Sequence, residues 1–456
     1  MELQKLDREL YGSFVEKIVE APFLSRQLVS FQANKGRPRY RWYKYKEAFS
    51  ANLVEHLLSS YGVDSGCLLD PFAGVGTALF AAADMGLDSE GIELLPIGQE
   101  VIATRQLIEN GISQSDIDAL KKFCEEKVWE RSEGKVEIQH LRITEGAYPI
   151  ETEELMSKFL YSALKQPNTV SRILKFALLC ILESISYTRK DGQYLRWDYR
   201  SGRRPGTNTF NKGVIYPFNE AITSKIAEIL DDIEHANKEK ASSGCKRGSV
   251  SLLKGSCLDL LGTIPDEKYD VIMTSPPYCN RYDYTRTYAL ELALMGTDNE
   301  ALSRLRQHML SCTVENREKD LIACNLNWGR AIEAADSQQL LQSILAYLEQ
   351  QKKAKKLNNP GIYRMVKGYF YEMSCVIQEC ARTIKSGGYM FMVNDNVRYA
   401  GASISVDLIL SDIAEKLGFE TENILVLPQK KGNSSQQMGA HGKDSLRKCV
   451  YVWRKK

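Results

Sequence analysis

The chain has 456 residues, of which 43% are apolar and 26% are charged, and its formal net charge is +2. This composition is typical of a globular protein and excludes a disordered or collagen-like chain. The length exceeds one typical domain, so we expect two compact units or one domain with large insertions. The small net charge neither favours nor excludes a polyanionic partner, so only local clusters of charge are informative.

The cysteines and the N-terminus bear on the compartment. The eleven cysteines include no C-x-x-C pair, and histidines show no paired spacing. Disulfide frameworks and zinc sites are therefore disfavoured, and no metal is expected. The charged first eight residues predict no signal peptide, and the longest apolar run, 176–182, is too short to cross a bilayer. We expect a cytoplasmic protein with no membrane contact.

The N-terminal part begins with a predicted amphipathic helix over 2–20, and a basic and aromatic segment follows at 35–46. This segment has six basic residues, four aromatic residues and no acid. Such a pattern suits contact with phosphate together with stacking on bases, and the candidate residues are Arg39, Arg41 and Lys44. A solvated loop whose aromatic residues pack locally is the alternative. A helix is predicted over 47–60.

A strand, a glycine turn and a helix come next. The strand covers 67–70, the helix covers 78–85, and the turn between them contains Gly74 and Gly76. Glycines let the backbone approach a ligand closely, as in nucleotide-binding α/β sheets. A second strand over 89–92 ends in Glu93, where a carboxylate can accept hydrogen bonds from a ribose diol. The turn lacks the dinucleotide pattern and no P-loop lysine follows, so we expect an adenosyl ligand without phosphates.

A long, mostly helical region separates these elements from the next strand. The predicted helices are 96–110, 114–130, 151–163, 169–187 and 216–240. The region is too long for a simple crossover, so it is an insertion or a subdomain. It contains a second basic and aromatic stretch at 187–204, which we interpret as a loop that contacts nucleic acid. Its candidate residues are Arg189, Lys190, Arg196, Trp197, Arg200, Arg203 and Arg204.

The second half of the chain contains the remaining strands. Its predicted strands are 250–253, 269–273, 389–393, 421–427 and 448–453, and its main predicted helices are 360–384 and 403–417. The last two strands flank a loop rich in Gly, Ser and Gln at 430–442 and are expected to pair in antiparallel fashion. Alternating strands and helices predict an α/β fold with a mainly parallel sheet.

The strand over 269–273 runs into Thr274-Ser275-Pro276-Pro277-Tyr278. Neither proline can donate to a sheet and each fixes its own φ, so the backbone is stiff where the strand ends. A hydroxyl on one side and an aromatic ring on the other can grip a flat heterocycle that carries an amino group. An ordinary turn at a strand end is the alternative.

These motifs resemble those of the S-adenosylmethionine-dependent amino-methyltransferases of DNA, which methylate N4 of cytosine or N6 of adenine. Residues 70–77 resemble the family's first motif, 275–278 resemble its catalytic motif in the serine form, and 46–50 resemble the motif that closes over the methionine end of the cofactor. The resemblance implies a Rossmann-like methyltransferase sheet and S-adenosylmethionine as cofactor. The implied cofactor-binding residues are Phe49, Ser50, Asp70, Pro71, Phe72, Gly74, Gly76, Thr77, Glu93, Ser256, Cys257 and Asp259.

One position departs from the family. The family often places an Asp after the strand that precedes the catalytic one, to meet the adenine amino group. Here that position contains Ser256 and Cys257, with Asp259 three residues beyond Ser256, so Ser256 and Asp259 both remain candidates. The implied catalytic residues are Ser275, Pro276, Pro277 and Tyr278.

The resemblance also implies a function and its partners. Serine at the first catalytic position favours cytosine N4, with adenine N6 as the alternative and an RNA base methyltransferase as a further one. A scaffold that has kept only the fold is the rival from another class. Double-stranded DNA is the expected partner, and a restriction endonuclease is a second possible one.

The resemblance also suggests a division of the chain into five segments. They are 1–110 (N-terminal segment and cofactor-binding half), 111–245 (helical insertion and candidate target-recognition region), 246–283 (catalytic motif), 284–359 (second helical insertion) and 360–456 (remainder of the sheet).

Overall fold

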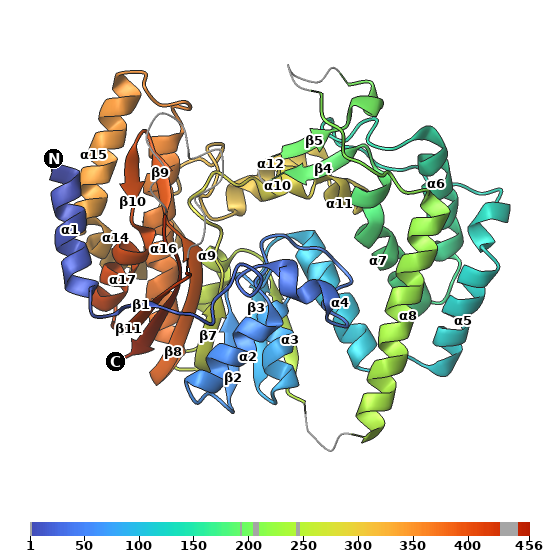
Figure 1. Cartoon of the computed structure of the whole chain (residues 1–456), viewed down its shortest axis with the longest axis horizontal. Helices are drawn as coiled ribbons and strands as arrows, with labels where there is room; N and C mark the ends of the chain where they lie inside the picture. Colours follow the sequence, from blue (N-terminus) through green and yellow to red (C-terminus); the bar gives the residue numbers. More distant parts are fainter. Residues whose placement is uncertain (1, 192–193, 204–208, 243–246, 429–445) are drawn as a thin grey trace.

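A twisted eight-stranded sheet forms the centre of one of two lobes of the protein in the computed structural model (Figure 1). The structure describes residues 2–191, 194–203, 209–242, 247–428 and 446–456. The strands of this sheet, in spatial order, are β1 (Ile18–Glu20), β11 (Phe419–Val426), β12 (Lys448–Lys455), β8 (Ile384–Asp395), β7 (Tyr269–Thr274), β2 (Cys67–Asp70), β3 (Asp88–Glu93) and β6 (Val250–Lys254). Strand β12 runs antiparallel to both of its neighbours, and the other pairs are parallel.

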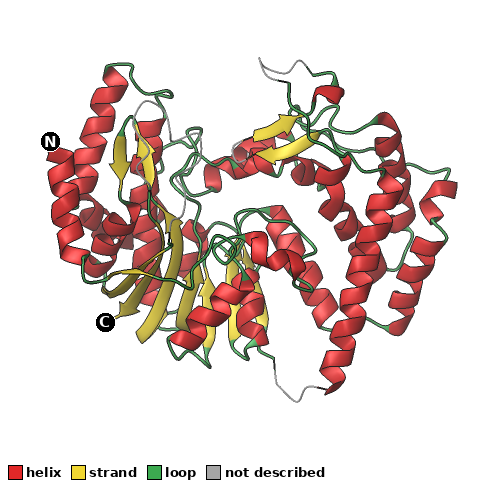
Figure 2. Cartoon of the chain, in the orientation of Figure 1, coloured by secondary structure: helices red, strands yellow, loops and turns green. Residues whose placement is uncertain are grey.

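Both faces of the sheet are covered by helices (Figure 2). Side chains alternate along a strand, so Val271 and Met273 of β7 enter one core while Ile272 enters the other. A strand buried on both faces is a continuous apolar run, which is why β7 lacks polar alternation. One face is covered by α2 (Ala51–Ser60), α3 (Thr77–Asp84) and α4 (Pro96–Glu109), and the other by α1 (Glu2–Phe14), α9 (Cys257–Leu260), α14 (Gly329–Asp336), α15 (Gln339–Lys353), α16 (Ile362–Thr383) and α17 (Val406–Lys416).

A second, mostly helical lobe stands beside the sheet (Figure 1). Its core contains three buried rings, Phe123, Trp129 and Phe159, whose centroids lie 5.4–5.6 Å apart. The lobe contains α5 (Gln114–Glu125), η2 (Val128–Arg131), α6 (Ile150–Leu164), α7 (Asn168–Ile185), the hairpin of β4 (Thr188–Asp191) and β5 (Tyr194–Trp197), η3 (Tyr199–Ser201) and α8 (Phe218–Ser242). Aromatic residues of the N-terminal segment, including Trp42 and Tyr43, belong to the same core.

Shorter elements connect the two lobes and complete the sheet lobe. Helices α10 (Tyr284–Thr287) and α11 (Ala289–Leu294) pack on the helical lobe. The η5 turn (Leu326–Trp328) and α14 pack on α16. These remaining elements are η1 (Phe31–Gly36), η4 (Leu261–Thr263), α10 (Tyr284–Thr287), α11 (Ala289–Leu294), α12 (Asn299–His308), α13 (Leu321–Cys324), η5 (Leu326–Trp328), β9 (Val397–Tyr399) and β10 (Ala402–Ile404). Among the described residues, no helix combines the length and the apolar character that crossing a membrane requires.

The predicted Rossmann-like α/β fold with a C-terminal antiparallel hairpin is confirmed. Three local predictions differ from the structure. The helix predicted over 2–20 ends at Phe14 and is followed by β1; the stretch 187–204 contains the β4–β5 hairpin rather than a loop throughout; and β9 and β10 were not predicted. The Gly/Ser/Gln-rich loop at 430–442 lies outside the described residues.

The strand order indicates which crevice of the sheet is suited to bind a ligand. Strand β2 is followed in sequence by β3 on one side of it, whereas β7 pairs on its other side. Connections that leave in opposite directions open a space at the carboxyl ends of the strands, where ligands bind in open α/β sheets. The predicted motifs follow β2, β3 and β7, so the topology brings them to this crevice.

Candidate active site

A cavity of about 750 Å³ opens at the carboxyl ends of β2, β3, β6 and β7. Its wall combines the glycine turn after β2, the acid at the end of β3 and the strand end that begins the Ser-Pro-Pro-Tyr motif. Residues of the second insertion, 308–310, complete it. Nine of the twelve predicted cofactor-binding residues line this cavity: Phe49, Asp70, Pro71, Phe72, Gly74, Thr77, Glu93, Ser256 and Cys257.

The turn after β2 needs its glycines. Gly74 and Gly76 have φ values of 55° and 78°, which side-chain-bearing residues rarely adopt. A Cβ on Gly76 would lie 2.8 Å from Cγ1 of Ile102, so space as well as backbone conformation excludes a larger residue. The turn places the backbone N–H of Gly74 at 2.6 Å from a carboxylate oxygen of Glu93.

Two buried carboxyl groups face the cavity. Glu93 accepts hydrogen bonds from the backbone N–H groups of Gly74 and Leu95, each at 2.6 Å, and burial raises its pKa to about 8. Asp70 accepts from Thr274 Oγ1 at 2.7 Å, and burial raises its pKa to about 7. The Thr274 contact joins the end of β2 to the end of β7. It therefore holds the glycine turn and the Ser-Pro-Pro-Tyr motif at a constant separation.

Three predicted cofactor residues do not line the cavity. Ser50 caps α2 by accepting a hydrogen bond from the backbone N–H of Leu53, and Gly76 is the N-cap residue that precedes α3. Asp259 is exposed on α9. Of the two candidates after β6, Ser256 is the one at the cavity wall, and its hydroxyl donates to the carbonyl of His308 at 3.0 Å.

A second cavity of about 630 Å³ adjoins the first. The two share Glu47, Ser275 and Tyr284, so these side chains stand at the junction. The Ser275 hydroxyl donates to the phenol oxygen of Tyr278 at 3.1 Å. Burial raises the pKa of Tyr278, which keeps this phenol neutral. The second cavity is lined by Lys46, Glu47, Ser275, Tyr278, Asn280, Tyr282, Tyr284 and Asp395.

The four predicted catalytic residues are distributed between the two cavities. Ser275 lines both, Pro277 lines the first and Tyr278 lines the second, while the side chain of Pro276 lines neither. This distribution follows from the motif, because successive residues at an extended strand end point in different directions. Ser275 is thus the one member of the motif in contact with both spaces.

Sequence reasoning missed several residues of the second cavity. Lys46 and Glu47 lie within the motif at 46–50, which signalled their importance although only Phe49 and Ser50 were selected. Asp395 ends β8 at the same edge of the sheet as Ser275, and its position at a strand end was the available signal. Asn280, Tyr282 and Tyr284 lie a few residues beyond the Ser-Pro-Pro-Tyr motif and carried no signal of their own.

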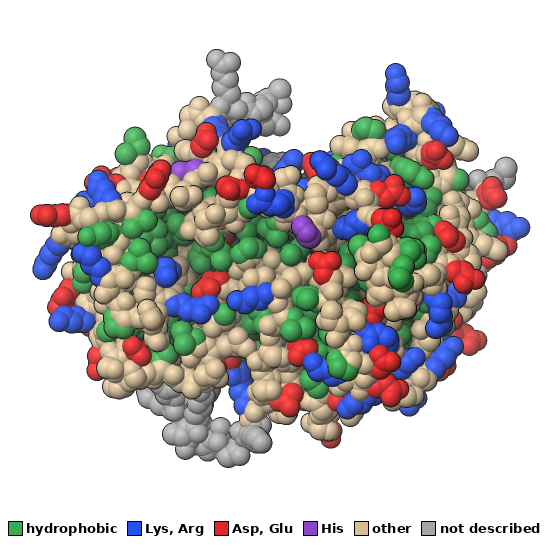
Figure 3. All heavy atoms as spheres, turned by 180° about the vertical axis from the view of Figure 1, so that it is seen from behind, with side chains coloured by type: hydrophobic (Ala, Val, Ile, Leu, Met, Phe, Trp, Pro, Cys, Tyr) green, Lys and Arg blue, Asp and Glu red, His purple; other side chains and the backbone are tan. Residues whose placement is uncertain are grey.

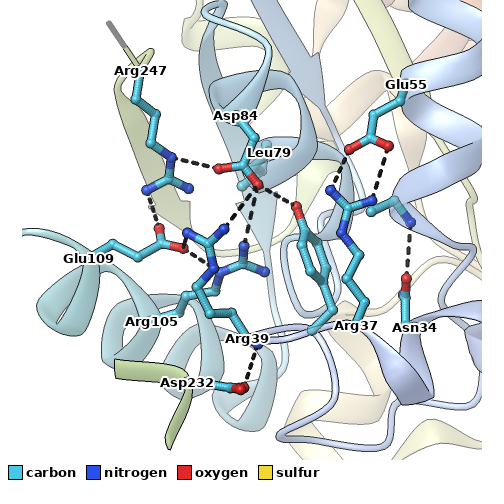
Figure 4. Close-up of polar contacts among 12 residues, drawn as sticks. Asn34, Arg37, Arg39, Glu55, Leu79, Asp84, Arg105, Glu109, Asp232 and Arg247 are labelled. Carbon is cyan, nitrogen blue, oxygen red and sulfur yellow. Dashed lines mark hydrogen bonds and ion pairs between the residues drawn. The ribbon is translucent and has the colours of Figure 1, made fainter. Parts of the chain in front are cut away.

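All three predicted nucleic-acid contacts in the N-terminal segment make ion pairs within the protein. That of Lys44 joins it to Glu183 of α7 at 3.6 Å. Arg39 lies 3.6 Å from Glu109 and 4.0 Å from Asp84, within the cluster of arginines and acids shown in Figure 4. Arg41 lies 2.6 Å from Asp232 of α8. These contacts fasten the segment to α3, α4 and α8. A nucleic-acid contact of Arg39, Arg41 or the half-exposed Lys44 stays a prediction.

The predicted basic residues of the helical lobe divide into exposed and internal ones. Arg189, Arg196 and Arg200 are exposed. Arg189 and Arg196 are partners across the β4–β5 hairpin, and Arg196 lies 3.5 Å from Asp191. Arg200 pairs with Asp198, and the guanidinium of Arg203 lies 3.9 Å from the ring centre of Trp197. Arg204 lies outside the described residues. Figure 3 shows basic and acidic side chains interspersed over the back of the molecule, so that face has no field of a single sign.

Lys190 is buried rather than available at the surface. Its side chain is 3% exposed and pairs with Glu291, which is 1% exposed, and its ammonium also donates to the phenol oxygen of Tyr43 at 3.2 Å. The pair joins β4 to α11 and to the N-terminal segment. Lys190 therefore positions the hairpin, and its buried ammonium is not available to contact a nucleic acid.

Breaking this pair is expected to destabilise the protein. Lys190→Met leaves the Glu291 carboxylate buried without its cation, which costs about 3–5 kcal/mol of unfolding free energy. The double variant Lys190→Met/Glu291→Leu removes both charges and is expected to recover most of that loss. Urea unfolding of the three proteins measures the effect. Equal losses in the single and double variants would contradict the role assigned to the pair.

Among the residues that the structure describes, no group of three or more His, Cys, Asp and Glu side chains is arranged to hold a metal ion.

The chain matches no family model. It resembles a solved structure of a proposed sarcosine dimethylglycine methyltransferase from Galdieria sulphuraria at 10% identity, covering 99% of this chain and 98% of that one, but the TM-score of 0.29 is too low to carry an argument.

Relatives of known class match along almost the whole chain. The chain is 55% identical over 456 residues to the type II methyltransferase M.AvaI of Nostoc sp. (strain PCC 7120), covering 100% of this chain and 94% of the relative. The same values hold for M.AvaI of Anabaena variabilis. It is 39% identical over 469 residues to the type II methyltransferase M.BsoBI of Geobacillus stearothermophilus, covering 97% of this chain and 90% of the relative. Together with the paired cavities at the strand ends, this similarity over the full length shows that the chain belongs to the type II methyltransferase family.

Proposed function

We propose that the protein is the modification methyltransferase of a restriction-modification system and transfers a methyl group to N4 of a cytosine in double-stranded DNA. The observation that carries this proposal is the junction of the two cavities at Ser275. A methyl donor in the first cavity and a base in the second meet at the side chain whose motif resembles the amino-methyltransferases. Full-length similarity to type II methyltransferases supports the same class of reaction.

The first cavity suits S-adenosylmethionine. Its apolar wall and glycine turn accommodate a flat nucleoside, and a Cβ on Gly74 would lie 3.2 Å from the Tyr45 ring, so the turn is already in close contact. Glu93 is placed to accept hydrogen bonds from the ribose diol, and Asp70 offers a second carboxylate to the cationic part of the ligand. When bound, this group supplies an electrophilic methyl.

The residues around the second cavity prepare the amino group of the base. The lone pair of an exocyclic amine is delocalised into the ring, which makes it a poor nucleophile. The Ser275 hydroxyl oxygen and the Pro276 carbonyl can each accept one N–H of that amine, which directs the lone pair toward the first cavity. Tyr278 offers a ring for stacking. Positioning and charge complementarity then lower the barrier without a covalent intermediate.

A base that stays in the duplex stack cannot enter an enclosed pocket, so the target nucleotide is flipped out to reach the second cavity. The β4–β5 hairpin is the proposed contact with the DNA backbone. Arg189 and Arg196 lie directly opposite on its exposed face, although like charges at such a pair destabilise a hairpin. Asp191, 3.5 Å from Arg196, offsets part of that repulsion, and a phosphate between the two guanidiniums offsets the rest. We assign target recognition to the helical insertion at 111–245, which carries this hairpin.

Analysis of modified nucleosides tests the proposed reaction. We expect mass spectrometry of duplex DNA incubated with the protein and S-adenosylmethionine to detect N4-methylcytosine as the product. N6-methyladenine as the only product would favour the alternative base, and modification of transfer RNA in preference to duplex DNA would favour an RNA substrate. Sequencing of modified positions in a host that expresses the protein then identifies the target site.

A further inference from the structure

The second cavity contains a single cationic side chain among its described lining residues, Lys46. The two acids of its wall already have partners. Asp395 pairs with Lys448, and the Tyr288 hydroxyl donates to Glu47. Lys46 lines the second cavity but not the first, whereas its neighbour Glu47 lines both. Lys46 is therefore a residue of the proposed base pocket and not of the first cavity.

Lys46 is held in place from two directions. Its backbone N–H donates to the phenol oxygen of Tyr288 at 3.3 Å, and its ammonium donates to the backbone carbonyl of Lys190 in β4. That carbonyl is itself well positioned, because the Lys190 side chain is buried against Glu291 and Tyr43. An ammonium carries three N–H bonds, and the Lys190 carbonyl accepts one of them. The hairpin thus fixes the ammonium of a lysine that belongs to the wall of the second cavity.

The two candidate bases differ along the Watson–Crick edge, at the position beyond the ring nitrogen that neighbours the amino group. A cytosine whose N4 amine lies at Ser275 presents two further acceptors to the cavity, N3 and the carbonyl oxygen O2. An adenine whose N6 amine lies at the same point presents N1 and then a C2–H group, which accepts no hydrogen bond. A donor beside the O2 position therefore distinguishes the two bases.

We infer that Lys46 is a specificity-determining residue, whose ammonium donates a hydrogen bond to O2 of the flipped cytosine. With adenine in the pocket, the C2–H group displaces water from the ammonium and offers no acceptor. A site built to hydrogen-bond its substrate rejects an analogue that lacks the partner far more strongly than an apolar pocket does. This inference rests on the proposed function and names the residue that selects the base for it.

The test compares two targets in otherwise identical duplexes, the natural cytosine and an adenine at the same position. For the wild-type protein and the variant Lys46→Met, kcat/KM is measured for both duplexes. A charge-assisted hydrogen bond of this kind is worth about 10- to 100-fold in rate, so we expect the cytosine-to-adenine ratio to fall by about that factor in the variant. The Kd for S-adenosylmethionine is expected to change less than about threefold, because Lys46 does not line the first cavity.

A matched control separates specificity from stability. Lys225 is a half-buried lysine of α8 whose ammonium donates to the backbone carbonyl of Trp42 at 3.1 Å, and it lines neither cavity. Lys225→Met removes a similar hydrogen bond between the helical lobe and the N-terminal segment. We expect an unchanged ratio of kcat/KM for cytosine to kcat/KM for adenine in this variant. Equal losses on both bases in Lys46→Met, or no loss on either, would overturn the assignment.

A second measurement uses the wild-type protein and does not depend on how the variant folds. Replacing the target cytosine with 2-thiocytosine puts a weaker acceptor at the O2 position, and kcat/KM is expected to fall about tenfold. In Lys46→Met the same replacement is expected to have no further effect, and an equal fall in both proteins would count against the contact. If the wild-type protein makes only N6-methyladenine, the proposed function fails instead, so the two failures are distinguishable.

Discussion

Replacement of Ser275 by alanine is expected to lower the single-turnover rate of methyl transfer about 100- to 1,000-fold, the usual cost of removing one preorganised hydrogen-bonding group at a reacting centre. Ser275 lines both cavities, so its hydroxyl stands at the junction where the donor and the amine are proposed to meet. The alanine variant keeps the backbone carbonyl of Pro276. We therefore expect residual transfer and an unchanged Kd for S-adenosylmethionine.

The control for this variant is another buried serine. Ser374 of α16 is fully buried, and its hydroxyl donates to the carbonyl of Phe370 at 2.8 Å, outside both cavities. Ser374→Ala is expected to have wild-type activity. Rapid-quench assays with saturating DNA measure the chemical step directly. Wild-type rates in Ser275→Ala would remove the catalytic role, and a comparable loss in Ser374→Ala would show that the assay reports folding instead.

Replacement of Glu93 by glutamine is expected to weaken binding of S-adenosylmethionine about 10- to 100-fold, as measured by isothermal titration calorimetry. The carboxyl group accepts from two backbone N–H groups, and when ionised it keeps further lone pairs for the proposed contact with the ribose diol. An amide has one acceptor oxygen, so its NH₂ group would face Gly74 or Leu95. Glu90→Gln, three residues earlier on β3 and outside the cavity, is the matched control and should bind normally.

The pH dependence of the same residue provides an independent check. Because burial raises the pKa of Glu93 from 4.5 to about 8, the ligand-free protein carries a protonated carboxyl below that value. A raised pKa in the folded state contributes stability that is complete below about pH 4.5 and is lost as the pH rises through about 8. Ligand binding favours the ionised form, so affinity is expected to rise over the same window. The slope in affinity should be absent in Glu93→Gln, and the slope in stability should be reduced to what Asp70 and other buried acids contribute. Parallel slopes in the two proteins would contradict the assignment.

Local patterns in the chain were sufficient to predict the fold and the first cavity. The strand, glycine turn and helix around Gly74 depend on φ values that only neighbouring residues determine, so the turn was visible in the sequence. The same is true of the two prolines at 276 and 277, which end β7 whatever surrounds them. The acid at the end of β3 was predictable because parallel strands place their carboxyl ends at one edge of a sheet.

The pattern of basic residues could not show which of them form internal ion pairs and which are free to contact nucleic acid, because a charge in a sequence does not reveal its partner. Arg41 and Lys190 belong to similar basic and aromatic stretches, yet both are held by acids that lie far away in the chain, Asp232 and Glu291. Period-two alternation in the β4–β5 hairpin decides that Lys190 points inward while Arg189 points outward. Without the hairpin, the two adjacent residues look alike.

The first cavity, where we propose that the methyl donor binds, is thus encoded locally. The second cavity, the proposed base pocket, depends on contacts between distant segments. Short motifs sufficed for the first because each one is a strand end with its own turn. The second cavity combines residues 46–47, five residues between 275 and 284, and residue 395. The ammonium of Lys46 donates a hydrogen bond to a backbone carbonyl 144 residues away in the chain. Such a contact has no local signature, because packing of the two lobes rather than any backbone preference brings its partners together.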